Sequence, residues 1–129
     1  MNTPPPPLSA DLSAFIESAV PSVWALETLL FLRRNPDVGW APDRLVAELR
    51  ASGPLVNDCL AVLQRAGLIR GEGDGVRYAP ASPTLTALCD ELEAAYRERP
   101  VAVVNTITRR RSDALKGFAD SFRFGGWKS

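Results

Sequence analysis

Residues 40–79, WAPDRLVAELRASGPLVNDCLAVLQRAGLIRGEGDGVRYA, decide the fold. Pro42 stands at the first turn of a predicted helix, because proline is tolerated where the backbone N–H has no helical partner. That helix ends near Ser52-Gly53, and Pro54 starts a second one directly afterwards. Apolar residues repeat at helical spacing in both, at Leu45, Val46 and Leu49 and then at Val56, Cys59, Leu60 and Leu63. Two helices joined by so short a turn indicate a helix-turn-helix.

A β-hairpin is predicted directly after the second helix. Gly67 ends that helix, and Leu68-Ile69-Arg70 and Val76-Arg77-Tyr78 form two short strands. Asp74-Gly75 favours a tight turn between them. Residues 37–40, before the first helix, are too few for more than a turn and an isolated strand residue.

The sequence LAVLQRAGLIRGEGDGVRY, from Leu60 to Tyr78, resembles the recognition helix and wing of bacterial winged-helix transcription regulators of the MarR and IclR type. The resemblance covers roughly residues 22 to 80 and includes Trp40 to Leu45, which resembles the entry to the supporting helix. It implies a mainly α fold with a small β-hairpin, a winged helix-turn-helix with extra N- and C-terminal helices. It also implies a DNA-binding transcriptional regulator that acts on double-stranded DNA as a homodimer.

The flanking sequence divides the chain into three regions. Pro4 to Pro7 favour an extended conformation without an apolar face, so residues 1–8 are expected to be a disordered tail. Residues 9–82 hold an N-terminal helix capped by Ser9 or Asp11, a core helix opened by Pro21, and the motif above. Residues 83–129 form a helical extension that is a candidate dimerisation region.

Leu85, Leu88, Leu92 and Tyr96 give the extension's first helix an apolar stripe, which either covers the chain's own core or forms half of a dimer interface. Glu91 and Glu93 are expected on its solvent face. Pro100 breaks or kinks the helix, and residues 101–107 favour a strand by propensity but also fit a second helix, which is the interpretation we favour. A last helix follows Ser112, with an aromatic-rich end that is expected to dock on the same chain or on a second one; its apolar residues are Leu115, Phe118, Ala119, Phe122, Phe124 and Trp127.

Composition narrows the function. The chain has two cysteines and no histidine, so Cys59 and Cys89 are expected to be reduced core residues and no metal or cofactor is expected. No phosphate-binding glycine loop and no nucleophile with a paired base stands in the sequence, so no enzyme is predicted. No apolar run is long enough to cross a membrane and the N-terminus does not read as a leader, which predicts a cytoplasmic protein. Trp24 and Trp40 are expected to pack in the core.

The candidate DNA contacts lie on three segments. On the second helix, Asn57 and Gln64 have amides that can pair with adenine, and Arg65 can reach phosphate or guanine. Net charge is zero overall, but residues 97–129 hold eight Arg or Lys against three Asp or Glu. The predicted contacts are Asn57, Ala61, Gln64, Arg65, Arg70, Arg77, Arg109, Arg110 and Arg111.

Acidic residues at the same places favour an alternative. Asp58 on the second helix, and Glu72 and Asp74 at the hairpin tip, would repel phosphates. The alternative is a protein–protein interaction module on the same scaffold, with a partner in transcription or signalling and little or no DNA binding. A mixed interpretation, in which only the basic C-terminal third contacts nucleic acid, also stays open.

Overall fold

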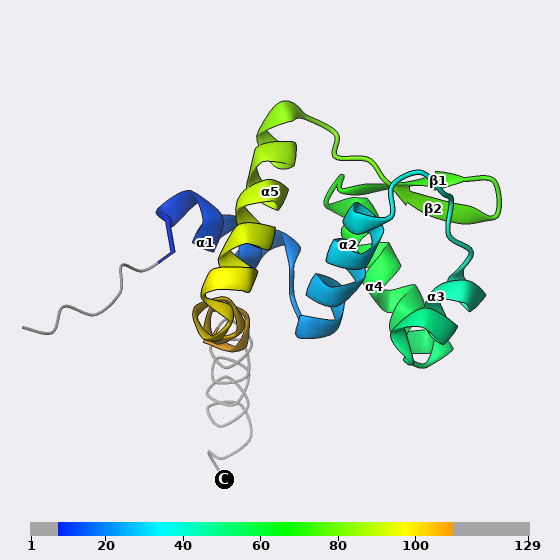
Figure 1. Ribbon diagram of the computed structural model, residues 1–129, viewed down its shortest axis with the longest axis horizontal. Coiled ribbons are helices and arrows are strands. Elements are labelled where there is room, and N and C mark those ends of the chain that lie inside the picture. The colour runs from blue at the N-terminus through cyan, green and yellow to red at the C-terminus, as the bar shows by residue number, and fades with distance from the viewer. Residues whose placement is uncertain (1–7, 110–129) are drawn as a thin grey trace, which may run out of the picture.

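The computed structural model describes residues 8–109 (Figure 1). These residues are mainly helical with one two-stranded antiparallel sheet, which confirms the predicted fold class at that level. Residues 100–109 form a further helical segment, as expected after Pro100. Arg110, Arg111 and the predicted last helix lie outside the described residues. The elements are α1 (Ala10–Ala19), α2 (Val23–Arg34), α3 (Pro42–Leu49), α4 (Gly53–Arg65), β1 (Ile69–Glu72), β2 (Gly75–Tyr78) and α5 (Pro83–Glu98).

Helix α2 runs through the middle of the core and packs against α4. Its first turn is capped by Ser22, whose Oγ accepts a hydrogen bond from the Ala25 N–H at 3.1 Å. The helix begins at Val23, two residues after Pro21, so the prediction that Pro21 opens it was wrong. Trp24 was also expected in the core, but it is 41% exposed, because it lies on the side of α2 that faces solvent. That face carries Ala25, Leu26, Thr28, Leu29, Leu30 and Leu32.

The turn between α3 and α4 does not use Gly53. Helix α3 ends at Leu49, and Arg50 takes the left-handed conformation with φ 55°. Ser52 then caps α4 through a hydrogen bond from Leu55 N–H, so Gly53 is already the first residue of that helix. The predicted Ser52-Gly53-Pro54 turn thus lies two residues too late, because an arginine accepts a backbone geometry that usually favours glycine.

Helix α4 ends at Arg65, and Gly67 directly after its C-cap Ala66, with a φ of 77°, turns the chain into the hairpin as predicted. The Leu68 N–H donates to the Leu63 carbonyl at 3.1 Å, which closes the helix end. In the hairpin Glu72 pairs with Gly75, so the two turn residues are Gly73 and Asp74. The predicted turn at Asp74-Gly75 was one residue too late.

Gly75 belongs to β2 because the backbone of Trp40 lies against it. Trp40 and Val76 exchange two backbone hydrogen bonds, of 2.8 and 2.9 Å, and so form the isolated strand pair expected before α3. A Cβ on Gly75 would lie 2.6 Å from the Trp40 carbonyl oxygen, closer than side chains tolerate. Trp40 itself is buried as predicted. Its ring packs edge-to-face against that of Phe31, with 4.8 Å between the ring centroids.

Helix α5 is fastened to α2 by charged side chains. Arg33 reaches Asp90 at 2.6 Å and also Glu93, and Arg34 reaches Glu93 at 2.6 Å. The Glu93 side chain is only 12% exposed, so the expectation that it faces solvent was wrong, because α2 lies beside that face of α5. Glu91 is exposed as expected and accepts a hydrogen bond from Ser9 Oγ.

The N-terminal helix α1 packs against α5. Leu12 and Ile16 of α1 are fully buried, and Leu8, placed in the tail by the sequence, is 7% exposed. Within residues 8–109 no single helix is long and apolar enough to cross a membrane, although α1 and α2 pass that test when joined across their 104° bend.

Candidate nucleic-acid interface

One side of α4 is open to solvent and lies next to the hairpin. Asn57, Ala61 and Gln64 are all exposed, as the sequence predicted, and their spacing of three or four residues places them in one row. The amide nitrogen of Gln64 lies 3.6 Å from where a Cβ on Gly71 would stand, so this row borders β1. We call these three residues the α4 row. It presents two amides and a small central side chain between them.

Asp58 and Arg65 lie on a different edge of α4. Asp58 lines a small apolar cavity with Pro21 and Ser22, at the start of α2. Helix α2 has no acidic residue in its first turn, and Asp58 is the acidic residue among those that line this cavity. Arg65 lines a neighbouring cavity with Ser18, also away from the hairpin. The acid that seemed to oppose DNA contact therefore stands beside the α4 row.

The hairpin brings its two arginines together. Arg70 and Arg77 are direct partners across the two strands, where like charges repel unless a counter-charge is near. Glu72 supplies it, since its Oε2 lies 2.6 Å from Arg77 Nε. The side chains of this ion pair are 33% and 48% exposed, so solvent weakens it. Among the described residues Arg70 makes no ion pair.

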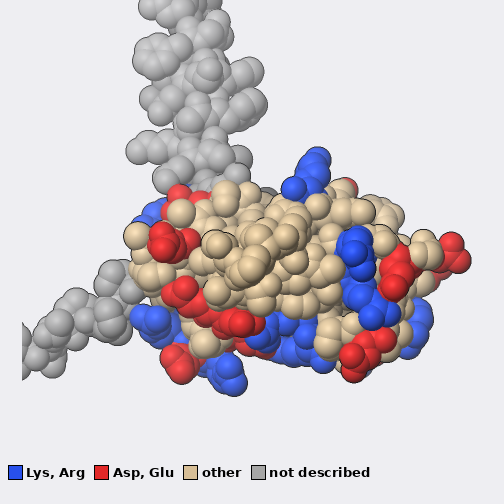
Figure 2. Space-filling model, turned by 90° about the horizontal axis from the view of Figure 1, so that it is seen from above, with Lys and Arg blue, Asp and Glu red and all other residues tan. Residues whose placement is uncertain are grey.

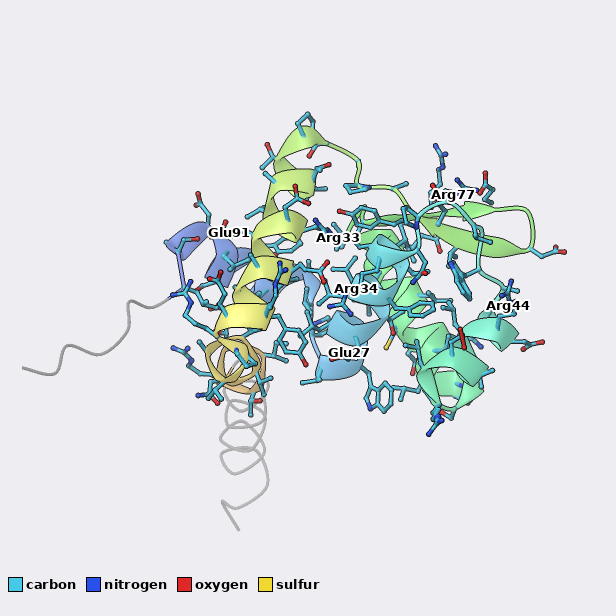
Figure 3. All side chains as sticks on the ribbon, in the orientation of Figure 1. Glu27, Arg33, Arg34, Arg44, Arg77 and Glu91 are labelled. Atoms are coloured by element: carbon cyan, nitrogen blue, oxygen red, sulfur yellow. The ribbon has the colours of Figure 1, made fainter. Side chains whose placement is uncertain are left out.

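Arg44 was not among the predicted contacts, but it belongs to the same end of the molecule. Its guanidinium carbon lies 4.7 Å from the ring centroid of Trp40, so a cation–π contact holds an exposed basic side chain at the start of α3. Figure 3 shows Arg44 and Arg77 at the hairpin end, whereas Arg33 and Arg34 point toward α5. No local sequence signal marks Arg44, because the contact depends on the turn before α3.

Arg109 is exposed but distant from this end. Residues 100–109 lie beside the C-terminal end of α5, on the side of the molecule away from the hairpin (Figure 1). The described chain therefore does not join Arg109 to the hairpin arginines. Arg110 and Arg111 lie outside the described residues.

Charge on the visible face is mixed. In Figure 2 a short strip of basic side chains lies over the hairpin end next to acidic ones, and the centre of the face carries no charge. No continuous basic stripe crosses that face.

The cysteines and Tyr78 are interior groups. Burial raises the pKa of both the Cys59 and the Cys89 thiol, and both are free and buried as predicted. Burial also raises the pKa of Tyr78, whose hydroxyl makes no hydrogen bond of ordinary geometry within the described residues and interacts weakly with the Cys89 thiol. In residues 8–109 no group of three or more His, Cys, Asp or Glu side chains is arranged to hold a metal ion.

Comparison with models of protein families, with curated proteins and with solved structures gives no match for this chain.

Proposed function

We propose that residues 22–80 form a winged helix-turn-helix that binds double-stranded DNA, and that the chain is a transcriptional regulator. The observation that carries this proposal is the α4 row, an exposed helix face next to a basic two-stranded hairpin. Helix α4 takes the part of the recognition helix and the hairpin that of the wing. This function requires no catalytic group and no cofactor.

The α4 row suits the major groove. The side-chain amides of Asn57 and Gln64 can each make two hydrogen bonds to the edge of adenine. Ala61 between them keeps the helix surface low, so that the backbone can approach the base edges, and its methyl group can contact thymine. Recognition by this row is therefore selective for A·T pairs.

The arginines supply contacts to phosphate. Arg70 is free of ion pairs within the described residues, Arg77 has only a solvent-weakened one, and Arg44 is held in place by Trp40. Such contacts fix the orientation of the protein without reading sequence. Two copies, joined through helices outside residues 22–80, would place two α4 rows in successive major grooves about 34 Å apart.

The test is binding of the full chain to A·T-containing duplexes selected from a random pool. Gln64→Ala and Asn57→Ala should each relax the preference at particular bases by about 1–3 kcal/mol. Arg70→Ala should weaken binding to all sequences alike. Arg97→Ala, on the exposed end of α5, is the matched arginine control and should change neither. A selected pool without sequence preference, or equal effects of Arg70→Ala and Arg97→Ala, would refute the assignment.

A specific observation also favours the alternative, a protein-interaction module. Glu72 and Asp74 are exposed at the hairpin tip, where contact with a phosphate backbone would repel them. A basic protein partner would be attracted to the same tip. Recovery of one stoichiometric partner, lost on Asp74→Lys, together with DNA binding that shows no sequence preference, would support this function instead.

A further inference from the structure

Trp40 is held between α2 and the hairpin by contacts with both. Its backbone exchanges two hydrogen bonds with Val76 of β2, and its indole N–H donates to the Asn35 carbonyl at the end of α2, at 3.2 Å. Its ring packs against Phe31 of α2, and the whole residue is only 6% exposed. The surrounding structure therefore fixes the position of the ring.

Arg44 lies over this fixed ring, with its guanidinium carbon 4.7 Å from the ring centroid. A cation–π contact depends on the charge and uses none of the N–H donors of the guanidinium. Within residues 8–109 the Arg44 side chain makes no ion pair and no hydrogen bond. The ring thus restrains the side chain while its donors stay available to an anion.

The same residue also places the hairpin strand that carries Arg77. Arg77 directly follows Val76, the residue that pairs with Trp40, and the Trp40 carbonyl lies against Gly75. Figure 3 shows Arg44 and Arg77 at the same end of the molecule. Trp40 therefore connects the two basic segments, because its ring contacts Arg44 and its backbone pairs with the strand of Arg77.

We propose that Trp40 is a positioning residue for DNA binding, which holds the Arg44 guanidinium ready for a backbone phosphate. This inference rests on the proposed function and adds to it a residue that acts through Arg44. An arginine that becomes ordered only on binding loses rotamer freedom, which weakens its contact about two- to tenfold. Because the Trp40 ring restrains Arg44 beforehand, most of that loss is avoided.

A double-mutant cycle in the full chain tests this, with the affinity for a labelled mixed-sequence duplex at low salt as the readout. Arg44→Ala should weaken binding about two- to tenfold more in the wild-type background than in Trp40→Leu, where no ring holds the arginine. Trp40→Phe keeps an aromatic ring beside Phe31 and should restore most of this difference.

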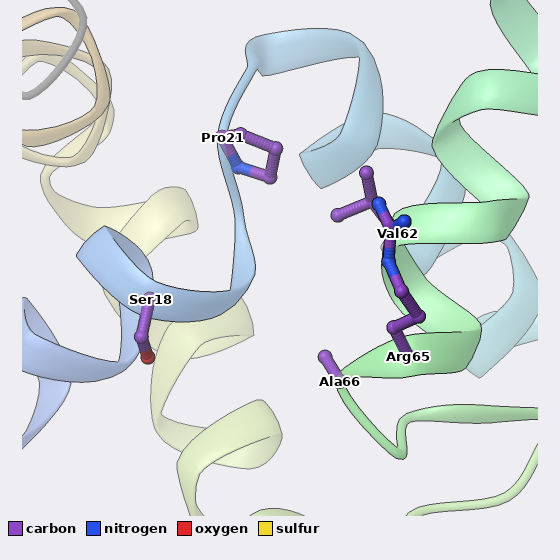
Figure 4. A pocket seen from close by; sticks show the side chains of 5 residues that line it. All are labelled: Ser18, Pro21, Val62, Arg65 and Ala66. Carbon is purple, nitrogen blue, oxygen red and sulfur yellow. The ribbon is translucent and has the colours of Figure 1, made fainter. Parts of the chain in front are cut away.

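Two substitutions on α4 are the controls. Arg65→Ala is the matched arginine change, since Arg65 lines a cavity with Ser18 and Pro21 (Figure 4) and makes no cation–π contact within the described residues. Asn57→Ala removes an amide of the α4 row. Each should change the affinity by the same factor in the wild-type and Trp40→Leu backgrounds, because both side chains belong to α4 and not to the segments that Trp40 holds.

A measurement without DNA serves if Trp40→Leu does not fold. The ring current of Trp40 should move the side-chain proton resonances of Arg44 upfield in the native chain, relative to the chain unfolded in urea. Ordinary Arg44 resonances in the native chain would mean that the ring does not hold the guanidinium, and would overturn the inference.

The affinities separate failure of this inference from failure of the proposed function. No DNA binding by the wild type at micromolar protein would refute the proposed function and this inference with it. Equal effects of Arg44→Ala in both backgrounds, with wild-type binding intact, would overturn the positioning role alone. An effect of Asn57→Ala that shrinks as much as that of Arg44→Ala in Trp40→Leu would also overturn it, since the loss would then be general.

Discussion

The backbone carbonyl of Trp40 lies so close to Gly75 that a Cβ there would stand 2.6 Å from the oxygen. This contact fixes the hairpin against the residue that leads into α3. We therefore expect Gly75→Ala to lower the free energy of unfolding by about 1–3 kcal/mol, because the two backbones would have to separate. Denaturant unfolding followed by circular dichroism measures this loss.

Gly71→Ala is the matched control, since Gly71 lies on the opposite strand and its Cβ would meet only Gln64, at an ordinary 3.6 Å. It should change the free energy of unfolding by less than about 0.5 kcal/mol. Equal losses for the two variants would mean that the Trp40–Val76 strand pair does not form.

Tyr96 links α5 to α2 through a hydrogen bond from its hydroxyl to Glu27 Oε2, at 2.7 Å. That bond, together with burial, raises the pKa of Tyr96 above its ordinary value. The resulting stabilisation is complete below pH about 10 and is lost as the pH rises through the folded-state pKa, because only the unfolded chain ionises readily. We expect Tyr96→Phe to lower the free energy of unfolding by about 1 kcal/mol at neutral pH.

Tyr78→Phe provides the comparison at neutral pH. The Tyr78 hydroxyl is buried, makes no hydrogen bond of ordinary geometry within the described residues and has only the weak Cys89 thiol as a partner, so its removal should change stability little. A loss of stability in Tyr78→Phe as large as that in Tyr96→Phe would contradict the assigned contacts.

The two cysteines should be unreactive in the folded protein. Burial raises the pKa of both thiols, so little thiolate is present at pH about 8, and both cysteine residues are buried. We expect almost no reaction of the native chain with Ellman's reagent and two equivalents in denaturant. Rapid native reaction of one equivalent would show that α4 or α5 opens locally.

Glu72 forms an ion pair with Arg77 at the hairpin tip. Under the proposed function, Glu72→Gln removes a negative charge from the hairpin tip and frees Arg77, whose ion pair is a weak surface one. The affinity for duplex DNA at low salt should therefore rise about two- to fivefold. Glu91→Gln, on the exposed side of α5, removes the same charge far from the hairpin and should have no such effect. Reduced affinity in Glu72→Gln would mean that the hairpin does not approach phosphate.

Local sequence patterns predicted the helices and strands better than the turns that connect them. The apolar repeat through Leu60 and Leu63, and Gly67 after it, gave the end of α4 correctly, because helix periodicity and the left-handed preference of glycine are local properties. The hairpin turn was predicted one residue too late because Gly75 belongs to β2, where it packs against the backbone of Trp40. That contact joins segments far apart in the sequence, so no local pattern reveals it. Arg50 in a left-handed conformation gives no sequence signal at all.

The candidate site shows the same division. Exposure of Asn57, Ala61 and Gln64 followed from their place between buried helix positions, whereas the position of Asp58 beside α2 required the packing of two helices. Trp24 was misplaced because an aromatic residue within an apolar run does not reveal on which side of the helix it falls. The cation–π contact of Arg44 likewise depends on tertiary structure.

The salt dependence of DNA binding tests the central claim most directly. The full chain is titrated against a fluorescently labelled mixed-sequence duplex, and the anisotropy is followed between about 50 and 200 mM salt. If Arg44, Arg70 and Arg77 contact phosphates, binding occurs at micromolar protein in low salt, and log K falls with log salt at a slope of about −2 to −3. No binding at micromolar protein in low salt, or an affinity that does not change with salt, would contradict the account.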